Sequence, residues 1–278
     1  MPTAEERRTA FRQLHASGCF VMPNPWDVGA ARYLQHLGFK ALATTSAGFA
    51  FSQGLPDADW AVSCDAMLAH ISEIVAASSL PVNADFESGY ADEPEEVEAN
   101  VKLCAATGVA GLSIEDATGE KAEPLYELEF AVERIQAARA ALDDAGSDVL
   151  LTARAECFLV GHPRAFEESM RRLQAYSEAG ADVLYAPGVL KPEEIRAMVS
   201  AVQPKPVNLL IGWSGGLSVS EAADLGVRRI SVGGALARSA WTGFIRAATQ
   251  IAEKGSFDGF EGLVPYHELN EFFRQPVD

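Results

Sequence analysis

The stretch that decides the fold is PVNADFESGYADEPEEVEANVKLCAATGVAGLSIED, residues 81–116. Its two short apolar runs, 81–86 and 110–115, have the composition of buried strands. The segment between them has helical periodicity and ends at Gly108, as helices often do. A strand, a helix and a second strand in this order predict a βαβ unit with parallel strands.

The same alternation extends over the whole chain. Eight runs have strand character: 19–23, 41–46, 81–86, 110–115, 149–155, 182–186, 206–211 and 228–232. Eight β/α repeats in 278 residues favour a (β/α)8 TIM barrel over an open sheet with a small extra domain. We expect one α/β domain over residues 1–278, with an N-terminal helix in about 1–18, the barrel in about 19–254 and a C-terminal helical extension in about 255–278.

Composition excludes several classes of protein. The net charge is −17, from 39 acidic and 22 basic side chains, without a Lys/Arg-rich run, so we expect no nucleic-acid partner. No stretch reaches the roughly 18 apolar residues that a membrane span needs, and the N-terminus lacks the apolar segment of a signal peptide. The four cysteines show no CxxC spacing, which disfavours disulfides and thiolate metal sites. We expect a cytoplasmic protein without a membrane partner.

Charged residues gather where the predicted strands end. In a (β/α)8 barrel, function lies at these carboxyl ends. The third strand runs into Asp85 and Glu87, the fourth into Glu115 and the fifth into Arg154, while the second runs into residues 46–48. Asp85 and Glu87 are two residues apart, a spacing that places both side chains on one face of a strand. The sequence therefore predicts several acids at one mouth of the barrel.

Several carboxylates in one cavity raise one another's pKa unless a positive charge joins them. An all-oxygen ligand set favours Mg²⁺ or Mn²⁺ over zinc, and Mg²⁺ keeps several of its waters. We predict a metal site formed by Asp85, Glu87 and Glu115, with Asp116 as a further candidate. The alternative is that these acids cap helices or pair with basic residues at the rim, and for Arg154 the alternative is an ion pair with Glu156.

Four motifs carry a family resemblance: TTSAGFAFSQGLPD (44–57), NADFESGYAD (83–92), GLSIEDATG (111–119) and TARAECFLVG (152–161). In this order they resemble the isocitrate lyase/phosphoenolpyruvate mutase superfamily over roughly residues 20 to 240. The resemblance implies a (β/α)8 barrel that uses Mg²⁺ and stabilises an enolate of a small 2-oxo acid. It also implies a homodimer or homotetramer in which the last helix packs on a neighbouring barrel, which suits the apolar tail after Gly255.

The resemblance implies roles for the acidic residues. Asp85 matches the main metal ligand of the superfamily, and Glu115 matches its next acid. Glu87 stands where a second aspartate is usual, a departure that lengthens the side chain and keeps the charge. Asp57 matches the acid on the loop that closes over the site, where we expect it to be catalytic.

The resemblance also implies the contacts to substrate. Ser46, Ala47 and Gly48 match the segment whose N–H groups and hydroxyl hold the substrate carboxylate. Arg154 matches the basic residue that neutralises the developing enolate, a form of oxyanion stabilisation worth about 3 to 4 kcal/mol per donor. Asn208, at the end of the seventh strand, is a further substrate contact. We expect Arg154 and Ser46 to serve both binding and catalysis.

One departure from the superfamily concerns the acid of the reaction. The lyase branch carries a Lys-Lys/Arg-Cys-Gly-His segment after the fourth strand, and its cysteine is the catalytic acid. The corresponding stretch here is ATGEKAEPL (117–125), with neither cysteine nor histidine. Cys157 has no basic neighbour to lower its pKa. Glu120 and Lys121 are the titratable candidates that we consider in this loop, and a solvated role is the simpler interpretation of both.

Other patterns suggest other chemistries. The glycines of GWSGGLS (212–218) and SVGGAL (231–236) lie where many barrels bind a phosphate, but tight turns are the preferred explanation because the acidic mouth repels phosphate. The five histidines are scattered, so a histidine metal cluster and a Ser-His-Asp triad are not expected. The rim residues Phe49, Phe51, Tyr185 and Trp213 do not reveal the length of the substrate.

The sequence predicts a Mg²⁺-dependent carbon–carbon lyase or decarboxylase for small anionic 2-oxo or 2-hydroxy carboxylates such as oxaloacetate, 2-methylisocitrate or isocitrate. One alternative is a phosphonopyruvate-type P–C bond enzyme, although the loop after the fourth strand is short for that branch. The other is a keto-acid-binding protein with little turnover. The particular acid, the proton donor that replaces the cysteine and the number of subunits are not specified by the sequence.

Overall fold

A sheet of eight parallel strands forms the centre of the structure, a computed structural model that describes residues 1–58 and 60–276. The strand order is β1-β8-β7-β6-β5-β4-β3-β2. The strands are β1 (Phe20–Met22), β2 (Leu42–Ala43), β3 (Val82–Asp85), β4 (Gly111–Glu115), β5 (Leu150–Arg154), β6 (Val183–Tyr185), β7 (Val207–Leu210) and β8 (Arg229–Ser231). Each strand lies inside one of the eight predicted runs, so the predicted α/β barrel is confirmed.

The barrel is closed except at one seam. β1 pairs with β8 and β2 pairs with β3, and within the described residues no strand ladder joins β1 to β2. The backbone still bridges this seam, because the N–H of Ala43 donates to the carbonyl of Pro23 at 3.0 Å. The eight strands therefore enclose an interior in which side chains from opposite strands can meet.

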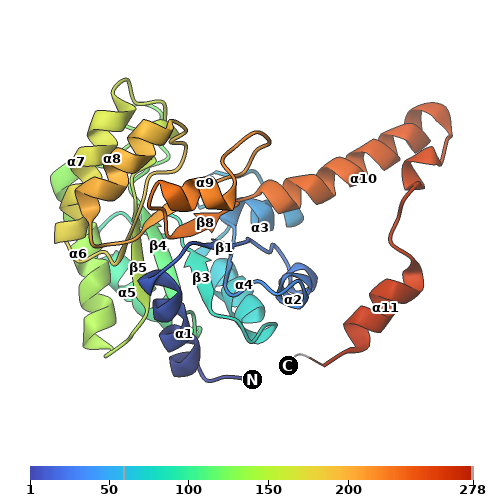
Figure 1. The fold of residues 1–278 in the computed structure, drawn as a ribbon, viewed down its shortest axis with the longest axis horizontal. Helices are drawn as coiled ribbons and strands as arrows, with labels where there is room; N and C mark the ends of the chain where they lie inside the picture. Colours follow the sequence, from blue (N-terminus) through green and yellow to red (C-terminus); the bar gives the residue numbers. More distant parts are fainter. Residues whose placement is uncertain (59, 277–278) are drawn as a thin grey trace.

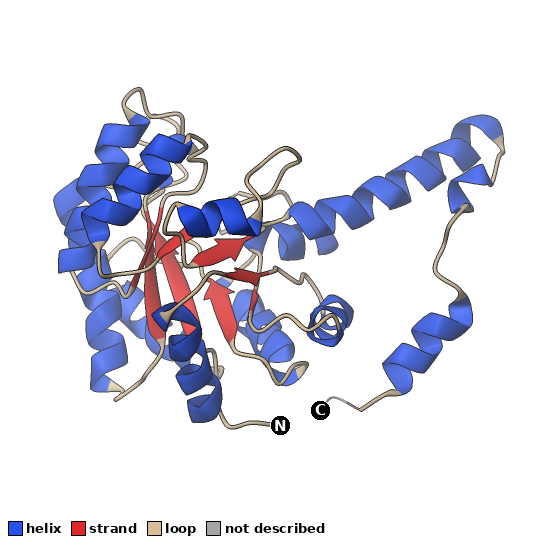
Figure 2. Ribbon diagram, viewed as in Figure 1, coloured by secondary structure: helices blue, strands red, loops and turns tan. Residues whose placement is uncertain are grey.

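Helices follow the strands and cover the outside of the sheet (Figures 1 and 2). They are α1 (Ala4–Ala16), α2 (Val28–His36), α3 (Ser46–Ser52), α4 (Cys64–Ala76), α5 (Pro94–Ala106), α6 (Leu128–Asp144), α7 (Ala165–Glu178), α8 (Pro192–Val202), α9 (Val219–Asp224), α10 (Ala235–Lys254) and α11 (Tyr266–Arg274), with short 3-10 turns at Glu156–Phe158 and Asp258–Phe260. The predicted N-terminal helix and C-terminal helical extension are both present.

The N-terminal helix closes one end of the barrel. Phe11 of α1 is fully buried and packs with Met22, Ala43 and Leu150, which come from three strands. It also approaches Gly111 of β4 so closely that a Cβ atom there would lie 2.8 Å from its ring. The end opposite to the carboxyl ends of the strands is thus filled by packed side chains.

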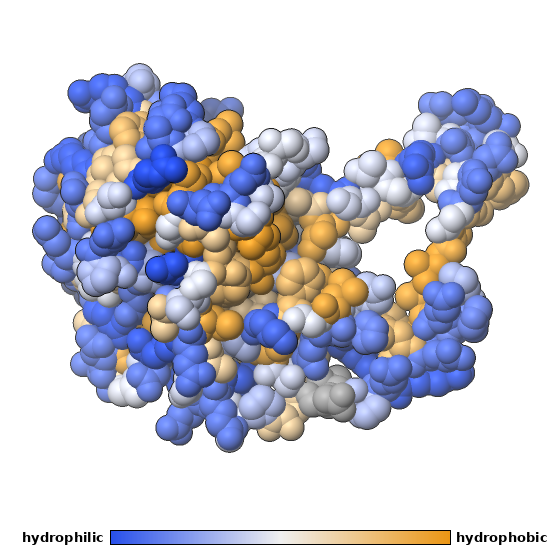
Figure 3. Space-filling view, in the orientation of Figure 1, coloured by the Kyte–Doolittle hydropathy of each residue, from blue (hydrophilic) through white to orange (hydrophobic). Residues whose placement is uncertain are grey.

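The C-terminal part of the chain extends away from the barrel as an arm (Figure 1). Of the 20 residues of α10, only Ala237 is buried. The arm then turns back, and the ring of Phe272 on α11 meets Tyr33 and His36 of α2. Figure 3 shows apolar surface along the segment before α11, where Leu263 and Val264 are exposed. Within the described residues no helix combines the length and apolar character needed to cross a bilayer.

Candidate active site

A cavity of about 350 Å³ opens at the carboxyl ends of the strands. Polar side chains from most of the strands line it, together with residues from the loops that follow them. Its lining includes Asn24, Thr45, Ser46, Ala47, Asp57, Asn83, Asp85, Glu87, Ser113, Glu115, Arg154, Glu156, Tyr185, Asn208, Arg229 and Ser231. The residue types and the location match those expected for the catalytic face of a barrel.

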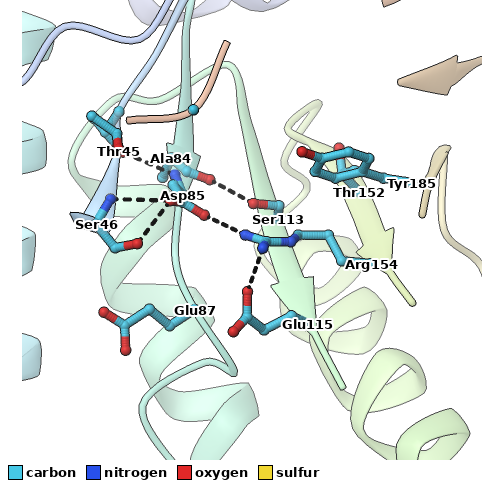
Figure 4. Close-up of polar contacts among 12 residues, drawn as sticks. Thr45, Ser46, Ala84, Asp85, Glu87, Ser113, Glu115, Thr152, Arg154 and Tyr185 are labelled. Atoms are coloured by element: carbon cyan, nitrogen blue, oxygen red, sulfur yellow. Dashed lines mark hydrogen bonds and ion pairs between the residues drawn. The ribbon is translucent and has the colours of Figure 1, made fainter. Parts of the chain in front are cut away.

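Arg154 is the centre of this cavity (Figure 4). Its Nη1 lies 2.7 Å from Asp85 Oδ1, its Nη2 lies 2.8 Å from Glu115 Oε2, and its Nε lies 2.9 Å from Glu156 Oε1. Three strand ends thus place an acid around one guanidinium. The five donors of an arginine in a fixed plane suit this arrangement, which a lysine cannot reproduce.

The charges in this cluster do not balance. Burial raises the pKa of Glu115 well above its usual value, Arg154 opposes the rise, and neighbouring acids add to it. The pKa of Glu156 is raised for the same reasons, burial first. Burial alone would lower the pKa of Arg154, but Glu115, Glu156 and Asp85 outweigh it and raise that pKa. The cluster therefore keeps a fixed positive charge and has an excess of acidic groups.

Asp85 connects Arg154 to the start of α3. Its Oδ2 accepts hydrogen bonds from both the N–H and the hydroxyl of Ser46, each at 3.0 Å. The helix begins at Ser46 because the hydroxyl of Thr45 accepts the N–H of Gly48 at 3.2 Å and caps the first turn. Ser46 therefore lies beside the acid that faces Arg154, and Ala47 lines the cavity next to it.

Glu87 reaches the cavity by a different route from the one predicted. β3 ends at Asp85, and Glu87 has a left-handed backbone with φ of 45°, so the alternation of a strand does not extend to it. Its carboxylate accepts from the N–H of Trp60 at 3.1 Å and from the hydroxyl of Tyr90 at 2.9 Å. A left-handed conformation is costly for a residue with a Cβ and is typical of functional sites.

Most of the predicted site residues lie together. Those that line the cavity are Ser46, Ala47, Asp57, Asp85, Glu87, Glu115, Arg154 and Asn208. Gly48 is buried and its N–H donates to the hydroxyl of Thr45, so its contact with substrate stays a prediction. Asp116 is 3% exposed and is held by Arg172 and the N–H of Glu156, which leaves it outside the lining.

A polar layer deep inside the barrel was not identified from the sequence. Arg229 is buried and donates to Asn208 at 2.8 Å, to Thr152 at 3.1 Å and to Asn83 at 3.4 Å. Barrel interiors are usually filled by branched apolar residues, so this polar layer is a departure. The signal was present in the strands as Asn83, Thr152, Asn208 and Ser231, since each interrupts an otherwise apolar run.

The two segments that could supply a conventional acid lie apart from the cavity. Residues 117–125 form a short hairpin, closed by pairing of Ala117 with Leu125, and contribute nothing to the described lining. Cys157 is buried, and burial raises its pKa to about 11. A protonated, buried thiol agrees with the expectation that this cysteine is not activated.

The acids of the cavity can be compared with the predicted metal site. Within residues 1–58 and 60–276 no three His, Cys, Asp or Glu side chains are grouped closely enough to hold a metal ion together. Mg²⁺ is commonly bound through one or two carboxylates and several waters, so a three-ligand cage is not required. The oxygen donors of Asp85, Glu87 and Glu115 around one cavity fit such an ion in their chemistry.

An eight-stranded parallel barrel with a polar cavity at the carboxyl ends of its strands has the architecture of a TIM-barrel enzyme. The family model for phosphoenolpyruvate phosphomutase matches residues 11–252. The chain belongs to the phosphoenolpyruvate mutase/isocitrate lyase superfamily, a group of lyases and mutases that typically use Mg²⁺ and bind small carboxylates. The resemblance inferred from the four motifs is therefore confirmed.

Two curated relatives and three solved structures extend this result. An uncharacterised protein of Mycobacterium tuberculosis is 31% identical over 94% of each chain, and an oxaloacetate decarboxylase of Pseudomonas putida is 30% identical over 100% of this chain and 96% of its own. A lyase or mutase candidate from Burkholderia cenocepacia has a TM-score of 0.93 and 48% identity, covering 99% of this chain and 98% of its own.

The other two structures are more distant. 2,3-Dimethylmalate lyase has a TM-score of 0.84 and 28% identity, covering 98% of this chain and 95% of its own. Oxaloacetate acetylhydrolase in complex with its product oxalate has the same TM-score and identity, covering 95% of this chain and 93% of its own. The relatives with named activities thus act on different small carboxylates.

Proposed function

We propose that the protein is a Mg²⁺- or Mn²⁺-dependent carbon–carbon lyase or decarboxylase that acts on small 2-oxo or 2-hydroxy carboxylates through an enolate. The observation that carries the proposal is the placement of Arg154 between three acids in a cavity lined by Ser46 and Asp85. Oxaloacetate is the first substrate to test, because oxaloacetate is named for two of the similar proteins.

Substrate recognition is assigned to one side of the cavity. The carboxylate of the substrate would lie at the first turn of α3, where Ser46 and Ala47 line the cavity. Arg154, fixed by its three acids, faces the oxygen on which negative charge develops. Donors that are held in place before the reaction stabilise this charge without reorganising. Asn208 and Asp57 complete the lining on which the substrate would be enclosed.

The carboxylates of Asp85, Glu87 and Glu115 would hold the cation, in part through water. When bound, it supplies Lewis-acid polarisation of the substrate carbonyl. Asp85 has a second task, since it orients both Arg154 and Ser46. This shared use makes Asp85 the acid whose loss affects binding and catalysis together.

The arm would form the contact between subunits in a homodimer or homotetramer. Trp241, Phe244 and Ile245 are exposed on a helix that has one buried residue, and isolated helices have little stability in water. An apolar hollow of about 420 Å³, lined by Phe51, Leu55, Trp241 and Ile245 among others, lies beside them. A second copy of the chain would cover this surface, as large exposed apolar patches usually require.

The experiment that tests the function is an assay with oxaloacetate, 2-methylisocitrate, isocitrate, 2,3-dimethylmalate and phosphonopyruvate, each with Mg²⁺ and with EDTA. We expect turnover of a 2-oxo or 2-hydroxy acid that EDTA abolishes. Asp85→Asn keeps the shape of the side chain, and we expect it to lower kcat/KM by at least about 100-fold and to remove the metal-dependent rise in Tm.

Cys157→Ser is the matched control, because Cys157 is buried outside the cavity, and its activity should stay close to that of the natural protein. Full activity in EDTA would contradict the metal assignment, and turnover of phosphonopyruvate alone would replace the proposed reaction. If no acid is turned over while oxalate or pyruvate raises the Tm only with Mg²⁺, the protein binds keto acids without converting them.

A further inference from the structure

A chain of hydrogen bonds runs through the interior of the barrel in a fixed direction. It starts at Arg229, whose Nε donates to Asn208 Oδ1 at 2.8 Å. A guanidinium has donors only, so the oxygen of the Asn208 amide must face it. The amide nitrogen of Asn208 therefore faces the other way, and it donates to the hydroxyl of Ser231 at 2.9 Å.

The chain ends at a phenol in the cavity. Ser231 accepts from Asn208, and its own hydroxyl lies 3.5 Å from that of Tyr185, to which it donates. Among the described residues this is the one hydrogen bond of the Tyr185 hydroxyl, so its own proton is left to donate to a ligand. Tyr185 lines the cavity, and Figure 4 shows its ring reaching from β6 toward Asp85 with the hydroxyl foremost.

The surroundings keep this phenol protonated and still able to release its proton. Burial raises the pKa of Tyr185 to about 12, so the group is neutral at neutral pH. The guanidinium of Arg154 lies 5.4 Å from the centre of the ring and opposes the rise, because a positive charge stabilises the phenolate. A weak acid of this kind is suited to protonating a strongly basic carbon.

Arg229 maintains the direction of this chain of hydrogen bonds. It is 2% exposed, and within the described residues it has no carboxylate partner, only Asn208, Thr152 and Asn83. Burial lowers its pKa to about 9, which still leaves it charged at neutral pH. A buried cation without a counterion is expensive. Neutral partners are consistent with a charge whose role is to orient the amide of Asn208.

We propose that Tyr185 is the proton donor to the enolate carbon, in the role for which this chain has no cysteine, and that Arg229, Asn208 and Ser231 are positioning residues. The inference rests on the proposed function. In the step, the O–H bond of Tyr185 breaks and the electron pair of the enolate C=C bond forms a C–H bond with its proton. The enolate oxygen becomes the carbonyl of the released 2-oxo acid, and water returns a proton to the tyrosinate.

The test is the form in which the product leaves the protein. With oxaloacetate and Mg²⁺, and enough protein to consume the substrate before the enol ketonises, the natural protein should release pyruvate. Tyr185→Phe should release enolpyruvate, visible as vinyl protons by NMR, and its kcat should fall by about 100-fold, as for loss of a general acid. Its KM and its inhibition by oxalate should change less than about threefold, because the ring and Arg154 remain.

Two variants of Ser231 test a positioning residue, and a variant of Tyr33 is the control. Ser231→Ala should lower kcat with little change in KM and release part of its product as the enol, whereas Ser231→Thr, which keeps a hydroxyl, should restore the keto product. Tyr33→Phe removes a phenol from the exposed side of α2 and should leave kcat and product form unchanged. The Tm of each variant reports whether it folds.

The outcomes separate the two proposals. A natural protein that converts none of the acids refutes the proposed function and the role of Tyr185 with it. An active natural protein whose Tyr185→Phe variant releases pyruvate directly overturns the role of Tyr185 alone. If Tyr185→Phe is unfolded, the Ser231→Ala variant decides. If Ser231→Ala releases keto product and no enol, the directional chain is overturned.

Discussion

At the scale of single residues, Arg154 decides the character of the cavity. It pairs with Asp85, Glu115 and Glu156, which follow one another around the barrel on β3, β4 and the turn after β5. Removing one member of a buried ion cluster usually costs more than the cluster contributes, because charges without partners remain. Substitution of Arg154 should therefore lower the free energy of unfolding strongly.

Arg154→Met keeps the length of the side chain and removes its charge. We expect loss of activity and a decrease in the free energy of unfolding of about 3 to 5 kcal/mol at about pH 8. The decrease should be smaller at about pH 5.5. Without Arg154, the pKa values of Glu115 and Glu156, already raised by burial, rise further, and these acids are then protonated in the folded state as pH falls.

Urea unfolding at the two pH values measures this difference. Arg171→Met is the matched control, since Arg171 is exposed and its nearest carboxylate oxygens are 3.7 Å away, and it should change stability by less than about 0.5 kcal/mol. An Arg154→Met protein that is equally destabilised at both pH values would contradict the coupling between Arg154 and the protonation of Glu115 and Glu156.

The sequence predicted the acids of the site better than their partners. Strand ends identified Asp85, Glu115 and Arg154, because the carboxyl ends of parallel strands meet at one face. The sequence left open whether a metal ion or a basic side chain such as Arg154 joins the acids, since that depends on the rotamer of Arg154 and on strand register. The pairing of Asp116 could not be deduced for the same reason, because Arg172 approaches it from a helix 56 residues further along.

At the scale of elements, the short helix α3 links the site to the arm. No helix was predicted over 46–52, because a run of seven residues with two phenylalanines and a glycine has no clear helical period. Its first turn is fixed by packing. A Cβ at Gly48 would lie 2.7 Å from Thr45 Cγ2, 2.9 Å from Trp26 Cβ and 3.2 Å from Ala237 Cβ.

Gly48→Ala should therefore displace the first turn of α3 and loosen the contact of Ser46 with Asp85. We expect a loss of about 1 to 3 kcal/mol in the free energy of unfolding, as for overpacking, and a decrease in kcat/KM. Gly243→Ala is the matched control in α10, where a Cβ meets nothing within 4 Å. There alanine should be neutral or stabilising by up to about 1 kcal/mol. Equal effects of the two substitutions would argue against close packing at Gly48.

The strands were predicted closely, and the loop after β3 was not. Apolar runs bounded by polar residues locate strands because burial on both faces requires them. The side-chain direction of Glu87 could not be deduced, since φ of 45° there, and of 55° at Tyr90, breaks the alternation on which the sequence argument relied. Both expected carboxylates reach the cavity, but only Asp85 does so as part of a strand.

At the scale of the whole molecule, only the part of the arm after Gly255 was predicted as a helical extension, whereas α10 was assigned to the barrel. The direction of the arm, away from the barrel, could not be deduced, because the sequence does not say which chain covers an apolar face. Phe244 and Ile245 are 61% and 55% exposed in the single chain. A substitution there should leave the fold of one subunit intact and affect only contacts between subunits.

We expect Phe244→Asp to shift the protein toward the monomer in sedimentation velocity while its circular dichroism stays unchanged, because a carboxylate cannot be buried without a partner. Thr249→Asp adds the same charge at another exposed position of α10 and should keep the natural number of subunits. A natural protein that sediments as a monomer would refute the assigned role of the arm.

The packed N-terminal end of the barrel makes the cavity a pocket with a single entrance. Among the residues that the structure describes, Phe11 and the layer around Arg229 are buried and fill the barrel below the cavity, so we expect a substrate and its products to use the same opening. Whichever product leaves last occupies the cavity that the next substrate needs. Inhibition by that product should therefore be competitive, and measurement of its pattern identifies which fragment remains longest beside Arg154.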